Sequence, residues 1–186
     1  MNKSTAFILI GGKSERFGSP KWQAIINGQT VLDRIWNASD KIENRFVIGK
    51  EKPQEFNKPF IQDMLVFNAP INGLYTALKN AKTDWVLLLS CDLPLIESGV
   101  IQKLWDSKNN KCDVIVPIAN EKVQVMCGFY HKRILQILES EIQKENYSLF
   151  KLLEKIDTSY VPFGNDQRFL NMNTQNDFNK IISLLY

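Results

Sequence analysis

The chain is poor in the residues from which metal centres and nucleic-acid-binding surfaces are usually built. Its 186 residues include one histidine, His131, and three cysteines without C-x-x-C spacing, so the sequence does not indicate a zinc site. The odd number of cysteines favours reduced thiols in a cytoplasmic protein. A net charge of +3, scattered along the chain, argues against nucleic-acid binding but suits small anionic ligands.

Long apolar stretches are also lacking. No run approaches the ~20 residues that a membrane-spanning helix needs. Residues 1–5 lead directly into an apolar segment, which leaves no room for a signal peptide with its cleavage site. We therefore expect no association with a membrane.

Short apolar segments alternate with amphipathic ones along the whole chain. The length fits one domain over residues 1–186, and the alternation predicts an α/β fold with a mostly parallel central sheet. The predicted strands are residues 7–10, 45–48, 60–65 with its end around Asp63, 85–89 at the sheet centre, 113–117, 123–130 and 158–161. The predicted helices are residues 31–39, 73–81, a helix capped by Ser98, 133–140, 148–156 and 174–185. Thr30 with Asp33, and Thr174 with Asp177, have the spacing of capping boxes. An Asn27-Gly28 turn follows an extended piece at residues 22–26.

The first predicted strand runs into two adjacent glycines, Gly11 and Gly12, and a loop that carries Arg16 and Lys21. Glycine lets the backbone turn sharply, and successive N–H groups in such a turn can form an anion-binding nest. Phe7 stands where a Walker loop needs glycine, and the G-x-G-x-x-G pattern is absent. The pattern predicts a phosphate-binding loop. The alternative is a glycine turn with solvated charges.

A second signal is Asp92, which follows the apolar strand 85–89 in the sequence Cys91-Asp92-Leu93-Pro94. Ligands of open parallel sheets bind beyond the carboxyl ends of the strands, where both this segment and Gly11 are expected. Mg²⁺ needs only one or two carboxylates in addition to substrate phosphates, so Asp92 is the candidate metal ligand. The alternatives are a turn-capping Asp92 and a nucleophilic Cys91 served by His131.

Residues 9–21 resemble the signature loop of the MobA-like nucleotidyltransferases, and residues 91–94 are similar to that family's metal-binding motif. Ile10 and Pro20 depart from the family pattern, in which Ala and Asp are common. The resemblance implies a Rossmann-like three-layer α/β/α fold. It assigns nucleotide binding to Leu9, Ile10, Gly11, Gly12, Ser14, Lys21, Gly49, Asp63 and Asp92, and catalysis to Arg16, Lys21 and Asp92.

Two later segments extend the resemblance. Residues 69–78 are similar to the family's G-P-L-x-G-x-x-x-A-L segment between nucleotide and acceptor, with Gly73 retained and Ala69 in place of the first glycine. Asn171 and Asn173 lie in an F-x-N-x-N-T segment, and with Gly73 they are the implied acceptor-binding residues. A carboxylate such as Asp63 can accept hydrogen bonds from guanine or from ribose, although a solvated loop residue is an alternative.

The resemblance implies Mg²⁺-dependent transfer of GMP from GTP to the phosphate of a molybdopterin-type cofactor, giving a guanine dinucleotide and pyrophosphate. The N-terminal part of the domain would bind the nucleotide and the C-terminal part the acceptor, with transient contact with molybdoenzyme maturation proteins. The alternatives are a cytidylyltransferase or sugar-1-phosphate nucleotidyltransferase of the same fold, and a non-catalytic nucleotide- or cofactor-binding adaptor.

Overall fold

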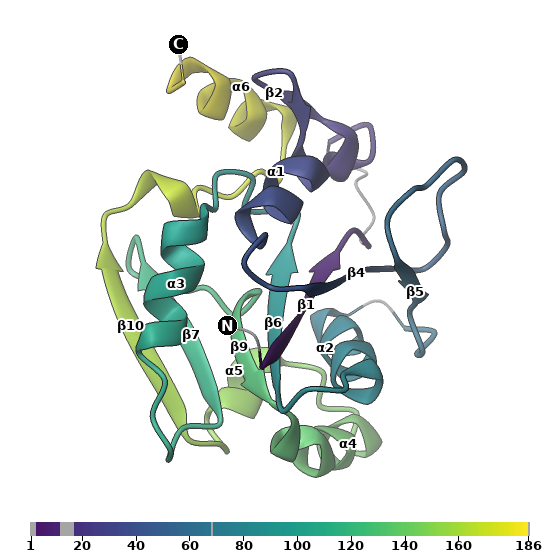
Figure 1. Ribbon diagram of the computed structural model, residues 1–186, viewed down its shortest axis with the longest axis vertical. Coiled ribbons are helices and arrows are strands. Elements are labelled where there is room, and N and C mark those ends of the chain that lie inside the picture. Colours follow the sequence, from purple (N-terminus) through teal and green to yellow (C-terminus); the bar gives the residue numbers. More distant parts are fainter. Residues whose placement is uncertain (1–2, 12–16, 68, 186) are drawn as a thin grey trace.

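The structure is a computed structural model, and it describes residues 3–11, 17–67 and 69–185. Its main sheet has the strand order β10-β7-β9-β6-β1-β4-β5, with β8 paired to β7 (Figure 1). The strands are β1 (Ser4–Leu9), β4 (Asn44–Gly49), β5 (Phe60–Gln62), β6 (Trp85–Ser90), β7 (Val114–Ala119), β8 (Lys122–Val123), β9 (Cys127–His131) and β10 (Thr158–Gly164). The pairs β1–β4, β1–β6, β4–β5 and β7–β10 are parallel, whereas β9 is antiparallel to β6 and β7 and β8 is antiparallel to β7. The predicted α/β class with a mostly parallel sheet is confirmed, and β6 lies in the middle.

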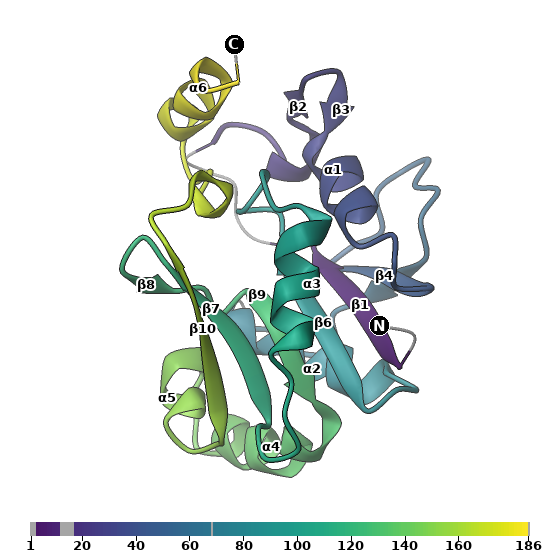
Figure 2. The same ribbon diagram turned by 60° about the vertical axis from the view of Figure 1, so that its left-hand side comes forward.

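Helices lie on both sides of this sheet, which gives three layers (Figure 2). The first set is α1 (Val31–Ala38), α3 (Ser98–Asp106) and α6 (Gln175–Ser183), and the second is α2 (Pro70–Asn80), α4 (Leu135–Gln143) and α5 (Leu149–Leu153). The buried side chains of the two sets belong to two separate apolar clusters. Helix α6 sits at the end of the molecule towards which the β6 arrow points (Figure 1).

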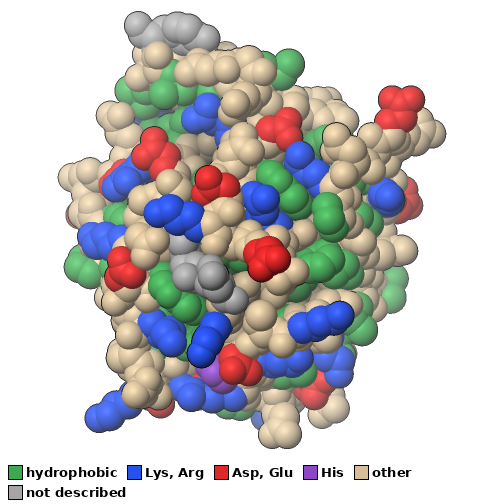
Figure 3. Space-filling view, viewed as in Figure 1, with side chains coloured by type: hydrophobic (Ala, Val, Ile, Leu, Met, Phe, Trp, Pro, Cys, Tyr) green, Lys and Arg blue, Asp and Glu red, His purple; other side chains and the backbone are tan. Residues whose placement is uncertain are grey.

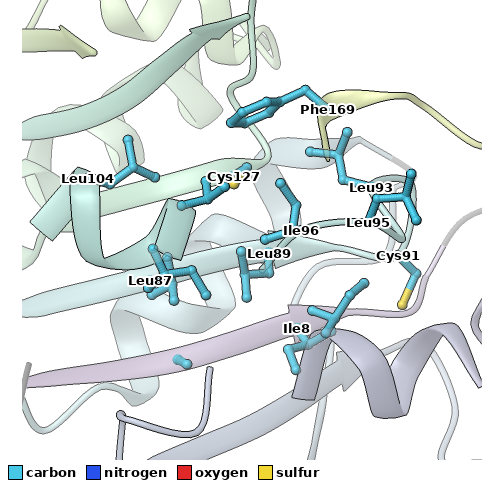
Figure 4. Close-up of a cluster of buried hydrophobic side chains, with 14 of the residues drawn as sticks. Ile8, Leu87, Leu89, Cys91, Leu93, Leu95, Ile96, Leu104, Cys127 and Phe169 are labelled. Carbon is cyan, nitrogen blue, oxygen red and sulfur yellow. The ribbon is translucent and has the colours of Figure 1, made fainter. Parts of the chain in front are cut away.

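Strand β6 is buried on both faces because its side chains alternate between the two clusters. Leu87 and Leu89 pack with Ile8 of β1 and Leu104 of α3 in the first cluster (Figure 4). The neighbouring leucine, Leu88, belongs to the second cluster, and all five side chains are at most 1% exposed. Truncating such a leucine to alanine typically costs about 2–5 kcal/mol. The strand that leads to Asp92 is therefore a rigid support.

Several local predictions are confirmed. Thr30 accepts a hydrogen bond from the backbone N–H of Asp33 at the start of α1, and Thr174 with Asp177 forms a complete capping box at α6. Asn27 and Gly28 have φ angles of 49° and 76°, and they connect the short strands β2 (Ile25–Ile26) and β3 (Gln29–Thr30). Two residues with positive φ are what a tight hairpin turn requires. The extended piece before the turn is shorter than expected, because a 3₁₀ turn, η1, occupies Lys21–Gln23.

β5 ends at Gln62, next to the predicted end around Asp63, and the chain beyond it is held by side chains of α2 rather than by another strand. Two other boundaries were predicted wrongly. The expected strand 123–130 is two strands, β8 and β9, each antiparallel to β7 and separated by a turn, in which the N–H of Cys127 bonds the carbonyl of Gln124 over 3.1 Å. Ser98 is the first residue of α3 rather than its cap; Glu97 is the N-cap and makes no side-chain capping bond.

On the face drawn in Figure 3, Lys and Arg side chains (blue) are interspersed with Asp and Glu side chains (red). The small net positive charge is thus not gathered into one broad patch on the described part of this face. Among the described residues, no helix is both long and apolar enough to cross a membrane.

Candidate active site

The carboxyl ends of β1, β4 and β6 meet at one edge of the sheet. Leu9 pairs in register with Ile48 of β4 and with Ser90 of β6. Just beyond the strands, the N–H of Ile10 bonds the carbonyl of Ile48 over 2.9 Å, and the N–H of Cys91 bonds that of Leu9 over 3.3 Å. The residues that directly follow the three strands, as far as Gly11 after β1, are thereby brought together.

A cavity of about 360 Å³ lies at this edge. Its lining comes from the ends of β1, β4 and β6, from the segment between β5 and α2, from the first turn of α2, and from the turn between β8 and β9. The residues are Leu9, Gly11, Ile48, Lys50, Asp63, Phe67, Ala69, Pro70, Asn72, Gly73, Ser90, Asp92 and Met126. Leu9, Gly11, Asp63, Gly73 and Asp92, which the sequence singled out separately, thus line one space.

Lys21 binds Asp92 beside this cavity. Its Nζ donates to Asp92 Oδ1 over 2.7 Å and to Asn173 Oδ1 over 2.9 Å. The Lys21 side chain is 16% exposed and that of Asp92 is 44% exposed. Three expected site residues from distant parts of the chain therefore form one cluster. It can present positive charge, carboxylate oxygens and an amide to a ligand.

The C-terminal segment holds Asn173 in place. The N–H of Met172 bonds the carbonyl of Asp92 over 2.8 Å, and the N–H of Asn173 donates to Asp177 Oδ2 over 3.0 Å. Hydrogen bonds from Thr174, above all, keep the pKa of Asp177 below its usual value. The capping box of α6 therefore also positions the residue that binds Lys21.

Asp63 has a different environment from Asp92. Its side chain is only 10% exposed, and Oδ1 has no hydrogen-bond partner among the described residues. Burial raises the pKa of Asp63, while the ammonium of Lys50, 3.8 Å from Oδ2, partly opposes that rise. A buried carboxylate oxygen without a donor costs free energy, and a bound ligand with N–H or O–H groups would recover it.

The backbone geometry at three positions near the cavity explains which residue type stands there. A Cβ on Gly73 would lie 2.4 Å from Leu9 Cδ1, and one on Gly49 would lie 3.0 Å from Ile10 Cγ1. Glycine at these positions allows α2 and β4 to pack closely against the end of β1. Ala69 has an extended backbone, with φ −145° and ψ 151°, so the structure has no need of glycine there.

The remaining expected site residues are placed less completely. Asn171 is exposed, as Asn173 is, with buried Met172 between them, so the two amides alternate as expected although the segment is no strand. Gly12, Ser14 and Arg16 lie outside the described residues.

The structure adds Lys50, Asn72 and Thr76, which the sequence analysis did not single out. Asn72 and Thr76 are buried polar residues of α2 that bind the segment after β5. In the sequence, the i, i+4 spacing of Asn72 and Thr76 among the apolar positions of that helix could have indicated these two residues.

A nucleophilic Cys91 served by His131 is excluded by the strand register. His131 pairs with Trp85 at the start of β6, whereas Cys91 follows the end of that strand. Cys91 is 4% exposed, and burial raises the pKa of its thiol. It is a packing residue.

The donors at Asp92 suit a hard cation such as Mg²⁺, which prefers carboxylate oxygens and retains waters and ligand phosphates. The Asp92 carboxylate is accessible and already binds one cationic group, the ammonium of Lys21. Among the described residues no three His, Cys, Asp or Glu side chains gather into an all-protein metal cage. A cation here would therefore depend on ligand oxygens as well as on Asp92.

This arrangement of sheet and helices is the α/β fold of nucleotidyltransferases. A solved structure of that fold is molybdopterin-guanine dinucleotide biosynthesis protein A from Archaeoglobus fulgidus, which superposes with a TM-score of 0.81 at 17% identity over 97% of this chain and 98% of that one. The chain belongs to the family described as MobA-like NTP transferase domain, which matches residues 6–159.

Two relatives match almost the whole chain. One, from Aquifex aeolicus, is named "Probable molybdenum cofactor guanylyltransferase" and is 34% identical over 97% of this chain and 91% of its own. The other, from Campylobacter jejuni subsp. doylei, is named "Molybdenum cofactor guanylyltransferase". It is 30% identical over 100% of this chain and 98% of its own.

Proposed function

We propose that this protein transfers GMP from GTP to the phosphate of a molybdopterin-type acceptor and releases pyrophosphate. The names of the two relatives support the choice of reaction. The observation that carries the proposal is that one cavity is lined both by Asp63, with its unpartnered Oδ1, and by Asp92, which binds Lys21. In this proposal the base would lie at Asp63, and the phosphates would lie beside Lys21 and the cation held by Asp92.

The nucleoside would occupy the cavity between the strand ends and α2. Asp63 would accept hydrogen bonds from the N1–H and amino group of guanine, which would satisfy its buried oxygen. The backbone at Leu9, Ile10 and Gly11 would lie against the nucleotide, and Gly49 would leave room beside it.

The triphosphate would lie along the turn after β1. Backbone N–H groups of Gly12 and Ser14, with Arg16 and Lys21, are the proposed phosphate ligands. Lys21 would neutralise charge that develops on the α-phosphate and on the departing pyrophosphate.

Asp92 would hold the Mg²⁺ ion, in line with the accessible carboxylate and its neighbouring ammonium. The ion, when bound, supplies charge neutralisation and orientation to the phosphate oxygens. Since Lys21 and Asp92 are paired, nucleotide binding would exchange part of this contact for contacts with phosphate.

The acceptor would bind on the C-terminal side, through Gly73, Asn171 and Asn173. Its terminal phosphate oxygen would form a new bond to the α-phosphorus while the bond to pyrophosphate breaks. A phosphate is already anionic, so the step needs positioning and charge neutralisation more than a general base. We also propose a cytoplasmic setting, supported by the three free cysteines, and transient contact with molybdoenzyme maturation proteins.

Calorimetry with GTP, CTP, UTP and ATP, each with Mg²⁺, tests the nucleotide half of the proposal. We expect clear preference for GTP, followed by pyrophosphate release once a molybdopterin acceptor is added. Preference for CTP or UTP would instead support a sibling activity of the same fold. GTP binding without pyrophosphate release in the presence of acceptor would support the adaptor alternative.

A further inference from the structure

Lys50 fastens the segment between β5 and α2. Its Nζ donates to the carbonyls of Leu65 and Phe67 over 2.7 and 3.0 Å. The amide of Asn72, on α2, donates to the same two carbonyls over 2.7 and 3.3 Å. Side chains from the end of β4 and from the start of α2 therefore bind the same loop, residues 63–67, from both sides. This loop forms one wall of the cavity.

The same ammonium faces Asp63, at the beginning of the loop. Nζ lies 3.8 Å from Asp63 Oδ2, and the N–H of Asp63 bonds the carbonyl of Gly49 over 2.9 Å. From α2, the hydroxyl of Thr76 also stabilises the carboxylate, and from β1 the turn presents Gly11, which carries no charge. Among the described residues, Lys50 is the charged group that acts on Asp63.

These contacts leave Asp63 Oδ1 buried and without a hydrogen-bond partner among the described residues, while Oδ2 is next to the ammonium. We propose that Lys50 is a specificity-determining positioning residue, which fixes Asp63 and keeps its carboxylate ready to accept from a base with two adjacent N–H donors. This inference rests on the proposed function, because Lys50, acting through Asp63, would favour guanine over a purine without the exocyclic amine. The role belongs to Lys50 itself, in addition to any role of Gly49 or Asp63.

The proposal makes a pH-dependent expectation. Burial raises the pKa of Asp63 and Lys50 lowers it, so removing the ammonium raises that pKa further. A protonated carboxyl offers fewer acceptor sites to the base. GTP affinity of a variant without the charge should therefore fall as pH decreases, over a range in which the unaltered protein changes less.

The test is calorimetry on the full chain with GTP and with ITP, each with Mg²⁺, at about pH 6 and about pH 8. The informative variants are Lys50→Met, which loses charge and donors, and Lys50→Gln, which retains an amide donor for the loop carbonyls. Lys50→Arg restores the charge, and Lys52→Met removes an exposed charge from the same connection. Thermal unfolding of every variant reports whether the fold is retained.

We expect both uncharged variants to lose about tenfold or more in GTP affinity at the lower pH, with a smaller loss at the higher pH. The affinity of the same variants for ITP, which lacks the amino group, should fall less. The ratio of GTP affinity to ITP affinity therefore becomes smaller than in the unaltered protein. Lys50→Arg should recover most of the affinity, and Lys52→Met should match the unaltered protein.

Two results would overturn the inference alone. One is Lys50→Gln binding GTP as the unaltered protein does at both pH values. The other is an equal, pH-independent loss for GTP and ITP, which would mean that Lys50 only braces the loop. If the unaltered protein fails to bind GTP or prefers CTP, the proposed function fails and the inference fails with it.

Discussion

Lys21 and Asp92 are 71 residues apart in the chain, yet their side chains form a 2.7 Å ion pair at the carboxyl edge of the sheet. The pair is partly exposed, and exposed pairs of this kind contribute only about 0–1 kcal/mol to stability. In the proposed function Lys21 would serve phosphate and Asp92 a cation, and the pair holds these two groups within reach of each other.

Replacing Lys21 with alanine should lower turnover by about 100-fold or more, the scale of losing one transition-state charge contact. Stability should change little, because the ion pair is partly exposed. Initial rates of pyrophosphate release measure the first effect and thermal unfolding the second. Exposed Lys41→Ala is the matched control, and a Lys21→Ala rate within tenfold of the control would contradict the role.

The variant Asp92→Asn should remove the dependence of turnover on Mg²⁺ concentration and leave little activity, because the amide lacks the charge that holds a hard cation. Rates measured over a Mg²⁺ titration report this directly. The exposed Asp40→Asn should keep the unaltered titration curve. A normal Mg²⁺ response in Asp92→Asn would move the metal site elsewhere.

Gly73→Ala should destabilise the protein by about 1–3 kcal/mol, the usual range for overpacking. The new methyl carbon would lie 2.4 and 2.8 Å from the two Cδ atoms of Leu9, which is nearly buried and lines the cavity. Urea unfolding gives the free energy. Gly99→Ala, in α3, is the control, since its nearest neighbour would be 4.0 Å away and alanine favours helix. Equal stability of the two variants would contradict the steric argument.

The cap of α6 should make stability depend on pH through Asp177. Hydrogen bonds from Thr174 lower the folded-state pKa of Asp177, so its contribution is present above the unfolded value of about 4 and is lost as pH falls through the lower folded value. At neutral pH, Asp177→Asn should cost at most about 1 kcal/mol. Unfolding curves from neutral pH down to about pH 3 should show this difference shrinking. A difference that grows in acid would reverse the expected sign.

Local patterns account for much of what the sequence predicted. The N-cap at Thr30 and the capping box at Thr174 depend on residues three apart, and the apolar run of β6 has side chains buried on both faces. Each feature is visible within a few residues. Gly11 and Asp92 were expected to share an edge because parallel strands end together, and they do line one cavity.

The loop after β5 could not be predicted in the same way. Leu65 has the apolar character of a strand residue, but its N–H and carbonyl are bound by Asn72, and its carbonyl also by Lys50. Those partners come from α2 and from the end of β4, and only the packed fold brings them together. The sequence likewise does not predict that Lys50 binds the carbonyls of this loop.

The closure of the site by the C-terminal segment has a consequence for synthesis of the chain. Lys21 meets Asn173 across 152 residues, and the ring of Phe178 on α6 packs edge-on against Phe17, 5.9 Å between centroids. A growing chain that has emerged only through α5 already carries Lys21 and Asp92 but lacks the amide and the helix that complete their surroundings. Because early segments can fold before later ones appear, the strands from β1 to β9 can pair first, before β10 joins the edge of the sheet. The cluster of Lys21, Asp92 and Asn173 is then completed last, when the final helix docks.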